Sequence, residues 1–375
     1  MNKIKLIDLT IDKKGHYGLG ASACSFNANY PLYLRITDID DNSYVRDLPT
    51  CVNPNEYLDY NNFLLSANDI VFARTGNSTG RNYFYDDKFK NVVFAGFLIK
   101  YALDPNKVVP KYVSYYCQSQ KYKATIESLS NGSTRKNLNA NQFGEIEIPI
   151  YPLDMQQHIV NIIGSIDELI EVNNNFFVKF NEIIRSLYNK YSEKSFVKVK
   201  LKELIYKVGK NCKNNEWKNF NVIDLSSMPE NNIVINSSSK GELFNTNIKT
   251  LTENTLLYGS IRPYFKKCGF TTNINYVAGT VHSFKTIQDN MHWWILAVIS
   301  SEDFHKHTNT KSQGTKMPII NWESFVSYDV PIIDDPLLKE FNDIIIPLYN
   351  SIIKMINSNS KLSELKKQYL NKFFG

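Results

Sequence analysis

The sequence predicts an α+β protein with two tandem domains, each followed by a long helix, and with the two helices paired as an antiparallel coiled coil in a pseudo-twofold arrangement. Three observations carry this prediction: the chain length, an internal repeat, and a heptad seam near the end of each repeat. At 375 residues the chain is longer than one hydrophobic core usually spans. Its 43% hydrophobic and 21% charged residues are typical of a folded globular protein.

The repeat is clearest between residues 131–150 and 313–332, which align without a gap. Gly132 matches Gly314, which sets an offset of 182 residues. At that offset the further matches are Ser133 with Thr315, Leu138 with Ile320, Asn139 with Asn321, Phe143 with Phe325, Ile148 with Val330 and Pro149 with Pro331. Upstream matches are weaker and their offset drifts up to 195, which places the insertions in the front half of the first repeat. We infer that one module has been duplicated.

Each repeat starts with a mixed region of short strands and ends in a helix. Runs rich in β-branched and aromatic residues at 70–73, 92–94 and 145–148 are separated by Gly, Asn and Asp turns. The predicted boundaries are 1–151 for the first domain, 152–195 for the central helix, 196–334 for the second domain and 335–375 for the C-terminal helix.

Each helix is marked by a seam of residues spaced alternately by four and three, as in a coiled coil. In the first helix the seam positions are Ile159, Ile163, Ile166, Ile170, Asn173, Phe177, Phe180, Ile184, Leu187 and Tyr191. In the second helix they are Phe341, Ile345, Leu348, Ile352, Met355, Asn359, Leu362, Lys366, Tyr369 and Phe373. The first seam is about 48 Å long at roughly 1.5 Å per residue, which favours an extended coiled coil. An ordinary two-helix core is the alternative.

The one asparagine in each seam predicts the register of an antiparallel pair. If Asn173 faces Asn359, every other layer is apolar except the one that contains Lys366. In that layer Leu365 is expected to take the inward position. A lone polar layer fixes register at some cost in stability, so we expect the two asparagines to share a hydrogen bond. Pro347 is expected to kink the second helix or to mark its start.

Charge and cysteine content narrow the class of protein. A net charge of +6 and a pI near 8.8 permit a polyanionic partner but do not identify one at this length. The five cysteines form no CxxC pair and are expected to be reduced thiols. The longest apolar run, residues 293–299, is too short to cross a bilayer, and residues 1–6 lack the apolar core of a signal peptide. We therefore expect a cytoplasmic protein that does not bind membranes.

Catalytic motifs are absent from the sequence. Residues 76–81 have neither the spacing nor the Lys-Ser/Thr end of a P-loop. Residues 53–56 and 94–97 come nearest to the tetrad of an amino-methyltransferase, and neither qualifies. The stretch His305-Lys306-His307 has no neighbouring carboxylate or thiol, so it is a poor metal site and is expected on a solvated helix face. We expect no catalytic residue, metal or cofactor on this chain.

Two polar, basic loops punctuated by glycine recur in both repeats and are candidate DNA contacts. Arg and Lys neutralise phosphates, Arg can bind guanine through two hydrogen bonds, and Asn and Gln can bind adenine in the same way. The alternative is a set of solvated turns, which the recurrence of both loops disfavours. The candidate DNA-binding residues are Arg74, Thr75, Asn77, Ser78, Thr79, Arg81, Asn82, Ser133, Thr134, Arg135, Lys136, Ser260, Arg262, Tyr264, Lys266, Lys267, Lys311, Gln313, Thr315 and Lys316.

The order of these features resembles the DNA specificity subunit of type I restriction-modification enzymes. A strand is followed by Arg-Thr-Gly (74–76) or Gly-Ser-Ile-Arg-Pro-Tyr (259–264), then by Ala-Gly and the Gly-Ser/Thr loop. The sequence Ile-Pro-Ile-Tyr-Pro-Leu-Asp-Met-Gln-Gln-His-Ile (148–159) then enters the long helix. Each of the two repeats carries this resemblance, so together they extend it over essentially the whole chain. The second repeat departs from it at residues 333–340, where the usual Pro-Leu-x-x-Gln is blurred.

The resemblance implies two target-recognition domains, each reading one half of a bipartite site in double-stranded DNA. It also implies that the helices set the unread spacer and dock methyltransferase (M) subunits, two of them. The M subunits would supply S-adenosylmethionine and methylate adenine, and restriction/translocase (R) subunits would join them for cleavage. The internal repeat agrees with this, because a pseudo-twofold protein predicts two half-sites at a fixed separation.

Two other classes of protein were weighed against this interpretation. A fused methyltransferase-nuclease would need cofactor and catalytic motifs, which the sequence lacks. A non-enzymatic coiled-coil repeat or interaction protein would share the helices, but it would have no need for paired basic loops.

Overall fold

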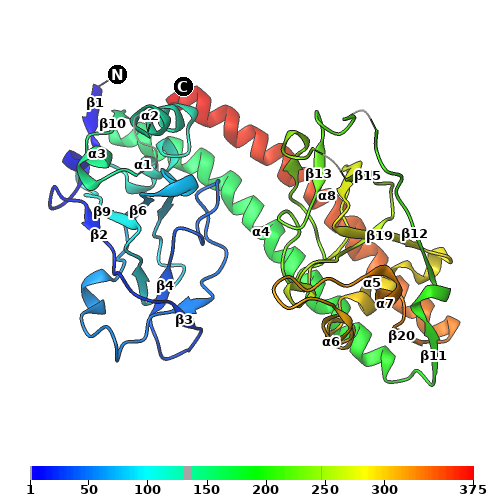
Figure 1. The fold of residues 1–375 in the computed structure, drawn as a ribbon. Coiled ribbons are helices and arrows are strands. Elements are labelled where there is room, and N and C mark those ends of the chain that lie inside the picture. The colour runs from blue at the N-terminus through cyan, green and yellow to red at the C-terminus, as the bar shows by residue number, and fades with distance from the viewer. Residues whose placement is uncertain (1, 131–136, 214, 246) are drawn as a thin grey trace. The chain divides into compact units, whose positions relative to one another are not determined.

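The computed structural model describes residues 2–130, 137–213, 215–245 and 247–375. Contacts within the chain divide it into two compact units, each of which contains strands of one sequence repeat (Figure 1). Unit 1 is Met1–Glu168 together with Leu362–Gly375, and unit 2 is Leu169–Lys361. The two units are described one at a time.

Unit 1 contains two four-stranded sheets and one two-stranded ribbon. The first sheet has, in spatial order, the strands β2 (His16–Tyr17), β9 (Leu98–Ala102), β6 (Asp69–Ala73) and β7 (Asn82–Phe84). The second has β3 (Cys24–Ser25), β5 (Thr50–Cys51), β4 (Leu32–Leu34) and β8 (Val92–Phe94), with β4 and β8 parallel. The ribbon pairs β1 (Asn2–Lys5) with β10 (Glu147–Ile150). All of β6 is buried, as its apolar run predicts.

Unit 2 has the same kinds of sheet in the same order along the chain. Its first sheet has β12 (Ile205–Lys207), β19 (Val281–Thr286), β16 (Leu256–Gly259) and β17 (Cys268–Gly269). Its second has β14 (Ser239–Lys240), β13 (Asn221–Ile223), β18 (Tyr276–Ala278) and β15 (Ile248–Thr250), with β13 and β18 parallel. The ribbon pairs β11 (Val197–Lys200) with β20 (Asp329–Ile332). The first sheet and the ribbon match strand for strand, and the second sheets share a parallel pair, β4 with β8 and β13 with β18, but differ in their outermost strand. The shared part supports the duplication inferred from the sequence.

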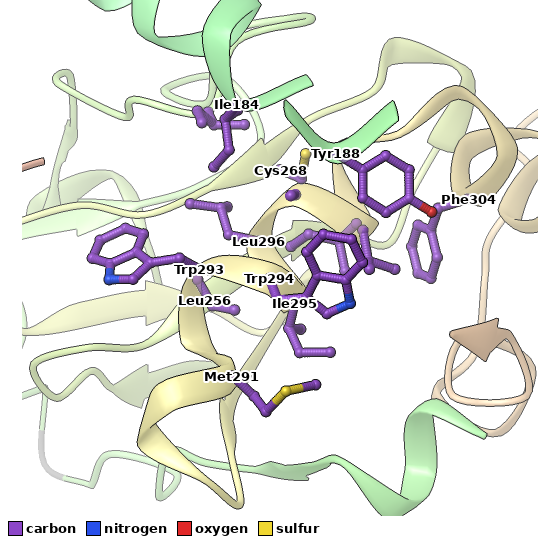
Figure 2. Packing of buried hydrophobic residues seen from close by; sticks show 14 of the residues in the cluster. Ile184, Tyr188, Leu256, Cys268, Met291, Trp293, Trp294, Ile295, Leu296 and Phe304 are labelled. Carbon is purple, nitrogen blue, oxygen red and sulfur yellow. The ribbon is translucent and has the colours of Figure 1, made fainter. Parts of the chain in front are cut away.

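Short helices complete the core of each unit. Unit 1 has α1 (Pro110–Tyr116), α2 (Gln120–Ser130) and α3 (Ala140–Gly144), and unit 2 has α5 (His292–Ile299), α6 (Glu302–Lys311) and α7 (Trp322–Phe325). Every residue of α5 is buried, so this helix lies at the centre of the core of unit 2 (Figure 2). Trp294 of α5 packs on Tyr188 with ring centroids 5.2 Å apart, and its Nε1 donates to the Pro331 carbonyl at 2.9 Å.

The two long helices are α4 (Leu153–Ser192) and α8 (Asp335–Phe374), each of 40 residues. Within unit 2 their segments run antiparallel in the predicted register. Asn173 Nδ2 donates to Asn359 Oδ1 at 2.7 Å, and the rings of Tyr191 and Phe341 lie 6.1 Å apart. Within unit 1 the pairing is antiparallel as well, because Tyr151, just before α4, donates its hydroxyl to the Phe373 carbonyl at 3.3 Å.

The seam layer that contains Lys366 differs from the prediction. Leu365 is 40% exposed, whereas the Lys366 side chain keeps the seam position and is 16% exposed. Lys366 Nζ pairs with Asp167 Oδ1 at 2.7 Å and lies 5.7 Å from the centroid of the Tyr115 ring. The expectation that Leu365 turns inward is therefore wrong, because a carboxylate and an aromatic face satisfy the ammonium group in place.

One of the two alternatives for Pro347 is excluded, and one predicted strand boundary needs correction. Pro347 does not mark the start of the second helix, because α8 begins at Asp335 and continues through the proline. The proline is tolerated on the exposed side of the helix, where Ser351 Oγ donates to its carbonyl at 3.1 Å. The strand predicted at 145–148 begins two residues later, at Glu147, because Ala140–Gly144 forms the capped helix α3.

Candidate nucleic-acid interface

In each unit the first candidate loop is a tight turn after a central strand, β6 or β16. We call residues 73–81 the first turn of unit 1 and residues 259–267 the first turn of unit 2. In both turns the first residue donates its N–H to the carbonyl of the last residue at 2.8 Å. Each turn also contains a short 3-10 helix. The two first turns therefore correspond residue by residue.

Two positions of the first turn have a left-handed backbone in both units. In unit 1 they are Gly76 (φ 68°) and Gly80 (φ 89°), and in unit 2 they are Arg262 (φ 51°) and Lys266 (φ 51°). Glycine adopts this conformation freely, whereas a residue with a Cβ atom loses about 1–2 kcal/mol. Unit 2 thus keeps two basic side chains at positions where unit 1 has none, despite the backbone strain.

The second candidate loop comprises residues 131–138 in unit 1 and 312–320 in unit 2, and in each unit its described end lies against the first turn. In unit 1 the Leu138 N–H donates to the Arg74 carbonyl at 2.9 Å, and in unit 2 the Ile320 N–H donates to the Ser260 carbonyl at 2.9 Å. The structure thus brings together two candidate segments that lie far apart in the sequence. Ser133, Thr134, Arg135 and Lys136 of the second loop of unit 1 lie outside the described residues.

Paired asparagines explain why the second loop recurs in sequence. The Asn139 side chain caps α3 by accepting from the Gln142 N–H at 3.0 Å, and the Asn321 side chain caps α7 by accepting from the Ser324 N–H at 2.8 Å. An asparagine at this position satisfies backbone donors at the start of a helix. Each cap fixes where the second loop ends.

Two of the candidate basic residues anchor the first turn to its own unit. Arg81 Nη1 donates to the Ile39 carbonyl at 3.2 Å, and its Nε donates to Asp41 Oδ1 at 2.7 Å. Lys267, at the same position of the turn in unit 2, donates from Nζ to the Leu225 carbonyl at 2.7 Å. Both residues bind a carbonyl 42 residues earlier in the chain. These contacts are structural, and they occupy the donors that would otherwise face a ligand.

Asn82 and Ser260 are candidates that the structure places in the interior. Asn82 is 1% exposed and its Nδ2 donates to the Cys117 carbonyl at 3.1 Å. Ser260 is 7% exposed and its Oγ donates to the Thr280 carbonyl at 2.6 Å. Neither side chain contributes to the exposed part of the turns.

Arg74 is held at the surface of unit 1 by two contacts. Its Nε donates to Asn137 Oδ1 at 3.3 Å, and its guanidinium carbon lies 4.9 Å from the centroid of the Tyr17 ring. A guanidinium group over an aromatic face is oriented without losing all of its donors. The neighbouring candidates are Thr75, Ser78 and Thr79, which are half-buried, and Asn77, which is exposed.

Arg262 is the exposed basic residue of the first turn of unit 2. Its side chain has no hydrogen bond or ion pair with any described residue. Lys266 is paired with Glu302 at 2.7 Å, and Tyr264, 48% exposed, packs on Phe265 with ring centroids 4.7 Å apart. The remaining candidates of unit 2 are all exposed: Lys311, Gln313, Thr315 and Lys316.

Sequence reasoning missed a second basic group in unit 2, formed by Lys207 and Lys249. Burial lowers the pKa of Lys249, and the nearby charge of Lys207 lowers it further. Burial lowers the pKa of His282, and the nearby charges of both lysines lower it further. His282 also connects this group to the second loop, because its Nε2 lies 2.9 Å from the Ile320 carbonyl. Neither lysine forms an ion pair within the described part of the chain. No sequence pattern flags them, because β12 and β15 bring them together only in the fold.

The expectation that His305-Lys306-His307 sits on a solvated face is wrong for both histidines. His305 is 1% exposed, with Nδ1 3.3 Å from the Tyr258 hydroxyl. His307 is half-buried, with Nε2 2.9 Å from the Ser324 carbonyl, and only Lys306 is exposed. Burial lowers the pKa of His305 to about 4, so its imidazole is neutral at pH 7. The described residues include no group of three His, Cys, Asp or Glu side chains that could hold a metal ion.

Comparison with known proteins shows which family part of the chain resembles. Residues 23–176 match the family described as the type I restriction modification DNA specificity domain. The match spans less than half of the chain, and over these residues the chain is similar to that specificity domain. The matched region covers most of unit 1 and ends within α4, and unit 2 repeats the strand order of the first sheet of unit 1.

Two known proteins are similar to this chain. A protein of Methanocaldococcus jannaschii, whose name describes it as a type I restriction enzyme MjaX specificity subunit, is 24% identical over 203 residues. The match covers 50% of this chain and 46% of that protein, so the chain spans about half the length of this curated relative. The crystal structure of a type I restriction-modification S subunit from M. genitalium matches over 100% of this chain and 96% of that one. Its TM-score is 0.54 and its identity 17%, and this likeness shows the fold.

None of the helices within the described residues has an apolar stretch long enough to cross a bilayer.

Proposed function

We propose that this chain is the sequence-reading subunit of a type I restriction-modification complex. It binds double-stranded DNA, and each unit reads one half of a bipartite site. One observation carries the proposal: each unit joins a constrained turn to a second polar loop by backbone hydrogen bonds, and each turn holds an arginine at or near the surface, Arg74 in unit 1 and Arg262 in unit 2.

The chemistry of the exposed side chains supports this function. Lys311 and Lys316 are long, flexible cations that can neutralise phosphates, and Lys207 and Lys249 add positive charge that is not balanced by an ion pair within the described chain. Amide side chains such as Gln313 can form two hydrogen bonds to adenine in the major groove. Contacts that hold phosphates and contacts that read bases are therefore both available in unit 2.

We propose that the catalytic steps belong to partner subunits. Two methyltransferase (M) subunits would bind the long helices, carry S-adenosylmethionine and methylate adenine, and restriction/translocase (R) subunits would join them for cleavage. The absence of a P-loop or methyltransferase motif from the sequence supports a non-catalytic role, which is general for specificity subunits.

A selection experiment tests the proposal. The full chain, co-expressed with its methyltransferase subunits, is incubated with a library of random-sequence duplexes, and the bound fraction is sequenced. We expect a motif of two defined parts separated by an undefined spacer, and an affinity that falls steeply as salt rises. Enrichment of a single undivided motif, or of none, would count against the proposal.

Alanine variants of the two arginines test the division of labour. We expect Arg74→Ala to weaken the preference for one half of the motif and Arg262→Ala to weaken the other, by about 5- to 150-fold each. Lys354→Ala, which removes one exposed charge from α8, is the matched control and should leave the motif unchanged. An equal loss at both halves from a single variant would contradict separate reading by the two units.

A further inference from the structure

We propose that Arg262 reads a guanine base in the half-site of unit 2. This inference rests on the proposed function and goes beyond it, because it assigns a base and separates base contacts from phosphate contacts. It starts from the backbone of the first turn of unit 2, where the arginine has a conformation that glycine would adopt without strain.

Hydrogen bonds on both sides fix the backbone of Arg262. Its N–H donates to the Pro318 carbonyl at 2.7 Å, and its carbonyl accepts from the Phe265 N–H at 3.0 Å. The next residue is Pro263, whose ring limits rotation of the following bond. The Cα–Cβ direction of Arg262 is therefore set by the turn, and the turn is joined to the second loop.

The equivalent residue in unit 1 shows that the turn does not need a side chain here. Gly76 occupies the same position, and a Cβ atom added to it would meet nothing within 4 Å. Arginine at this position is thus neither required for packing nor excluded by it. Strained residues of this kind persist where the strain serves function, and they cluster at binding sites.

Among the described residues, the other two basic side chains of this turn have partners and Arg262 does not. Lys266 is held by Glu302 at 2.7 Å, and Lys267 is held by the Leu225 carbonyl at 2.7 Å. The Arg262 guanidinium has no partner within the described chain. All of its donors are available to a ligand.

Guanine fits this group better than phosphate does. A planar guanidinium can donate two parallel hydrogen bonds to O6 and N7 of guanine, and this pairing needs a fixed direction of approach. A phosphate can be reached by any flexible cation, and Lys311 and Lys316 supply these from the neighbouring segment.

The test uses the full chain co-expressed with its methyltransferase subunits and a library of random-sequence duplexes. Arg262→Gly fits the left-handed backbone and should fold. Arg262→Lys keeps the positive charge but lacks the planar guanidinium that donates two parallel hydrogen bonds. We expect both variants to lose the preference for guanine at one position of one half-site by about 5- to 150-fold. The other half-site should keep its sequence. Lys316→Ala is the phosphate-type control, which should weaken binding to all sequences alike and lower the salt slope by about one.

Each outcome decides the assignment. If Arg262→Lys selects the wild-type motif, or if Arg262→Gly weakens all sequences alike with a lower salt slope, Arg262 holds a phosphate and the inference fails. If the position that changes was not guanine in the wild-type motif, the base assignment is wrong. If the wild-type complex selects no bipartite motif, the proposed function itself fails. It also fails if the affinity of the wild-type complex for DNA does not fall as the salt concentration rises.

Discussion

Units 1 and 2 share the strand order of the first sheet and the backbone of the first turn, yet they carry different side chains at equivalent positions of that turn. Gly76 and Gly80 in unit 1 correspond to Arg262 and Lys266 in unit 2, all with positive φ. The anchoring residue of each turn, by contrast, has the same role in both units, because Arg81 and Lys267 each bind a carbonyl 42 residues earlier. The repeat thus preserves the path of the backbone and leaves the exposed surface free to differ.

The same contrast holds inside the two cores. Phe72 of β6 lies 5.1 Å from Phe143, and Tyr258 at the matching position of β16 lies 5.1 Å from Phe325. In unit 2 the added hydroxyl binds Thr308 Oγ1 at 2.7 Å and draws polar groups into the core. At this pair of equivalent positions, unit 1 therefore makes a purely aromatic contact, whereas unit 2 adds a buried polar contact.

The largest expected difference between the units is their response to acid. Burial lowers the pKa of His282, His292 and His305 to about 4, and all three lie in unit 2. These imidazoles are neutral when folded and bind protons below about pH 6.5 when unfolded, so their stabilising effect is complete above pH 6.5 and is lost as pH falls toward 4. For His292 and His305 this amounts to about 3 kcal/mol each. We expect unit 2 to unfold first as the solution is acidified.

Fluorescence separates the two units in this measurement. All four tryptophans lie in unit 2, so their emission follows that unit, while far-UV circular dichroism follows both. His305→Gln should make the fluorescence transition less dependent on pH, and His158→Gln, at an exposed position in unit 1, should not change it. Loss of both signals together, or a tryptophan transition that starts only below pH 4, would contradict the prediction.

A smaller effect is expected at Asn82, which the sequence suggested as a DNA contact. Asn82→Ala removes the 3.1 Å hydrogen bond to the buried Cys117 carbonyl, so unit 1 should lose about 1–3 kcal/mol in the free energy of unfolding. Urea unfolding followed by circular dichroism measures this loss. Asn77→Ala, at an exposed position of the same turn, is the control and should change stability by less than about 0.5 kcal/mol. A change in the selected DNA motif with Asn82→Ala alone would reverse this assignment.

Local periodicity explains which parts of the fold the sequence could predict. The four-three spacing identified both helices, and the single asparagines gave the register in which Asn173 and Asn359 are hydrogen-bonded. A heptad seam depends only on neighbours along one helix, so it can be seen in the sequence. Lys366 was misjudged because its partner Asp167 lies on the other helix and outside the seam.

The sequence predicted which loops form the candidate site, but it did not predict which of their side chains are exposed. The two loops were found because they recur, and backbone hydrogen bonds join them in each unit. Sorting their side chains needed contacts that cross the fold, such as that of Arg81 with Ile39 or of Lys267 with Leu225. His305 was misplaced for the same reason, since only the packing of α6 decides which face of that helix is buried.

The smallest predicted effect exchanges the residues at one left-handed position of the two turns. Arg262→Gly relieves about 1–2 kcal/mol of backbone strain but gives the unfolded chain more freedom, so unit 2 should gain about 1 kcal/mol. Gly76→Arg should cost unit 1 about the same, because no atom within 4 Å would resist the new Cβ. Tryptophan fluorescence gives the urea midpoint of unit 2. Far-UV circular dichroism follows both units, so the midpoint of unit 1 is taken from the part of its transition that the fluorescence does not show. Gly80→Ala is the control for packing, since its Cβ would lie 2.6 Å from Ile126 Cγ2, and it should cost more than Gly76→Ala. A loss of stability in Arg262→Gly would mean that the arginine supports the turn, and its strained backbone would then need no explanation from DNA binding.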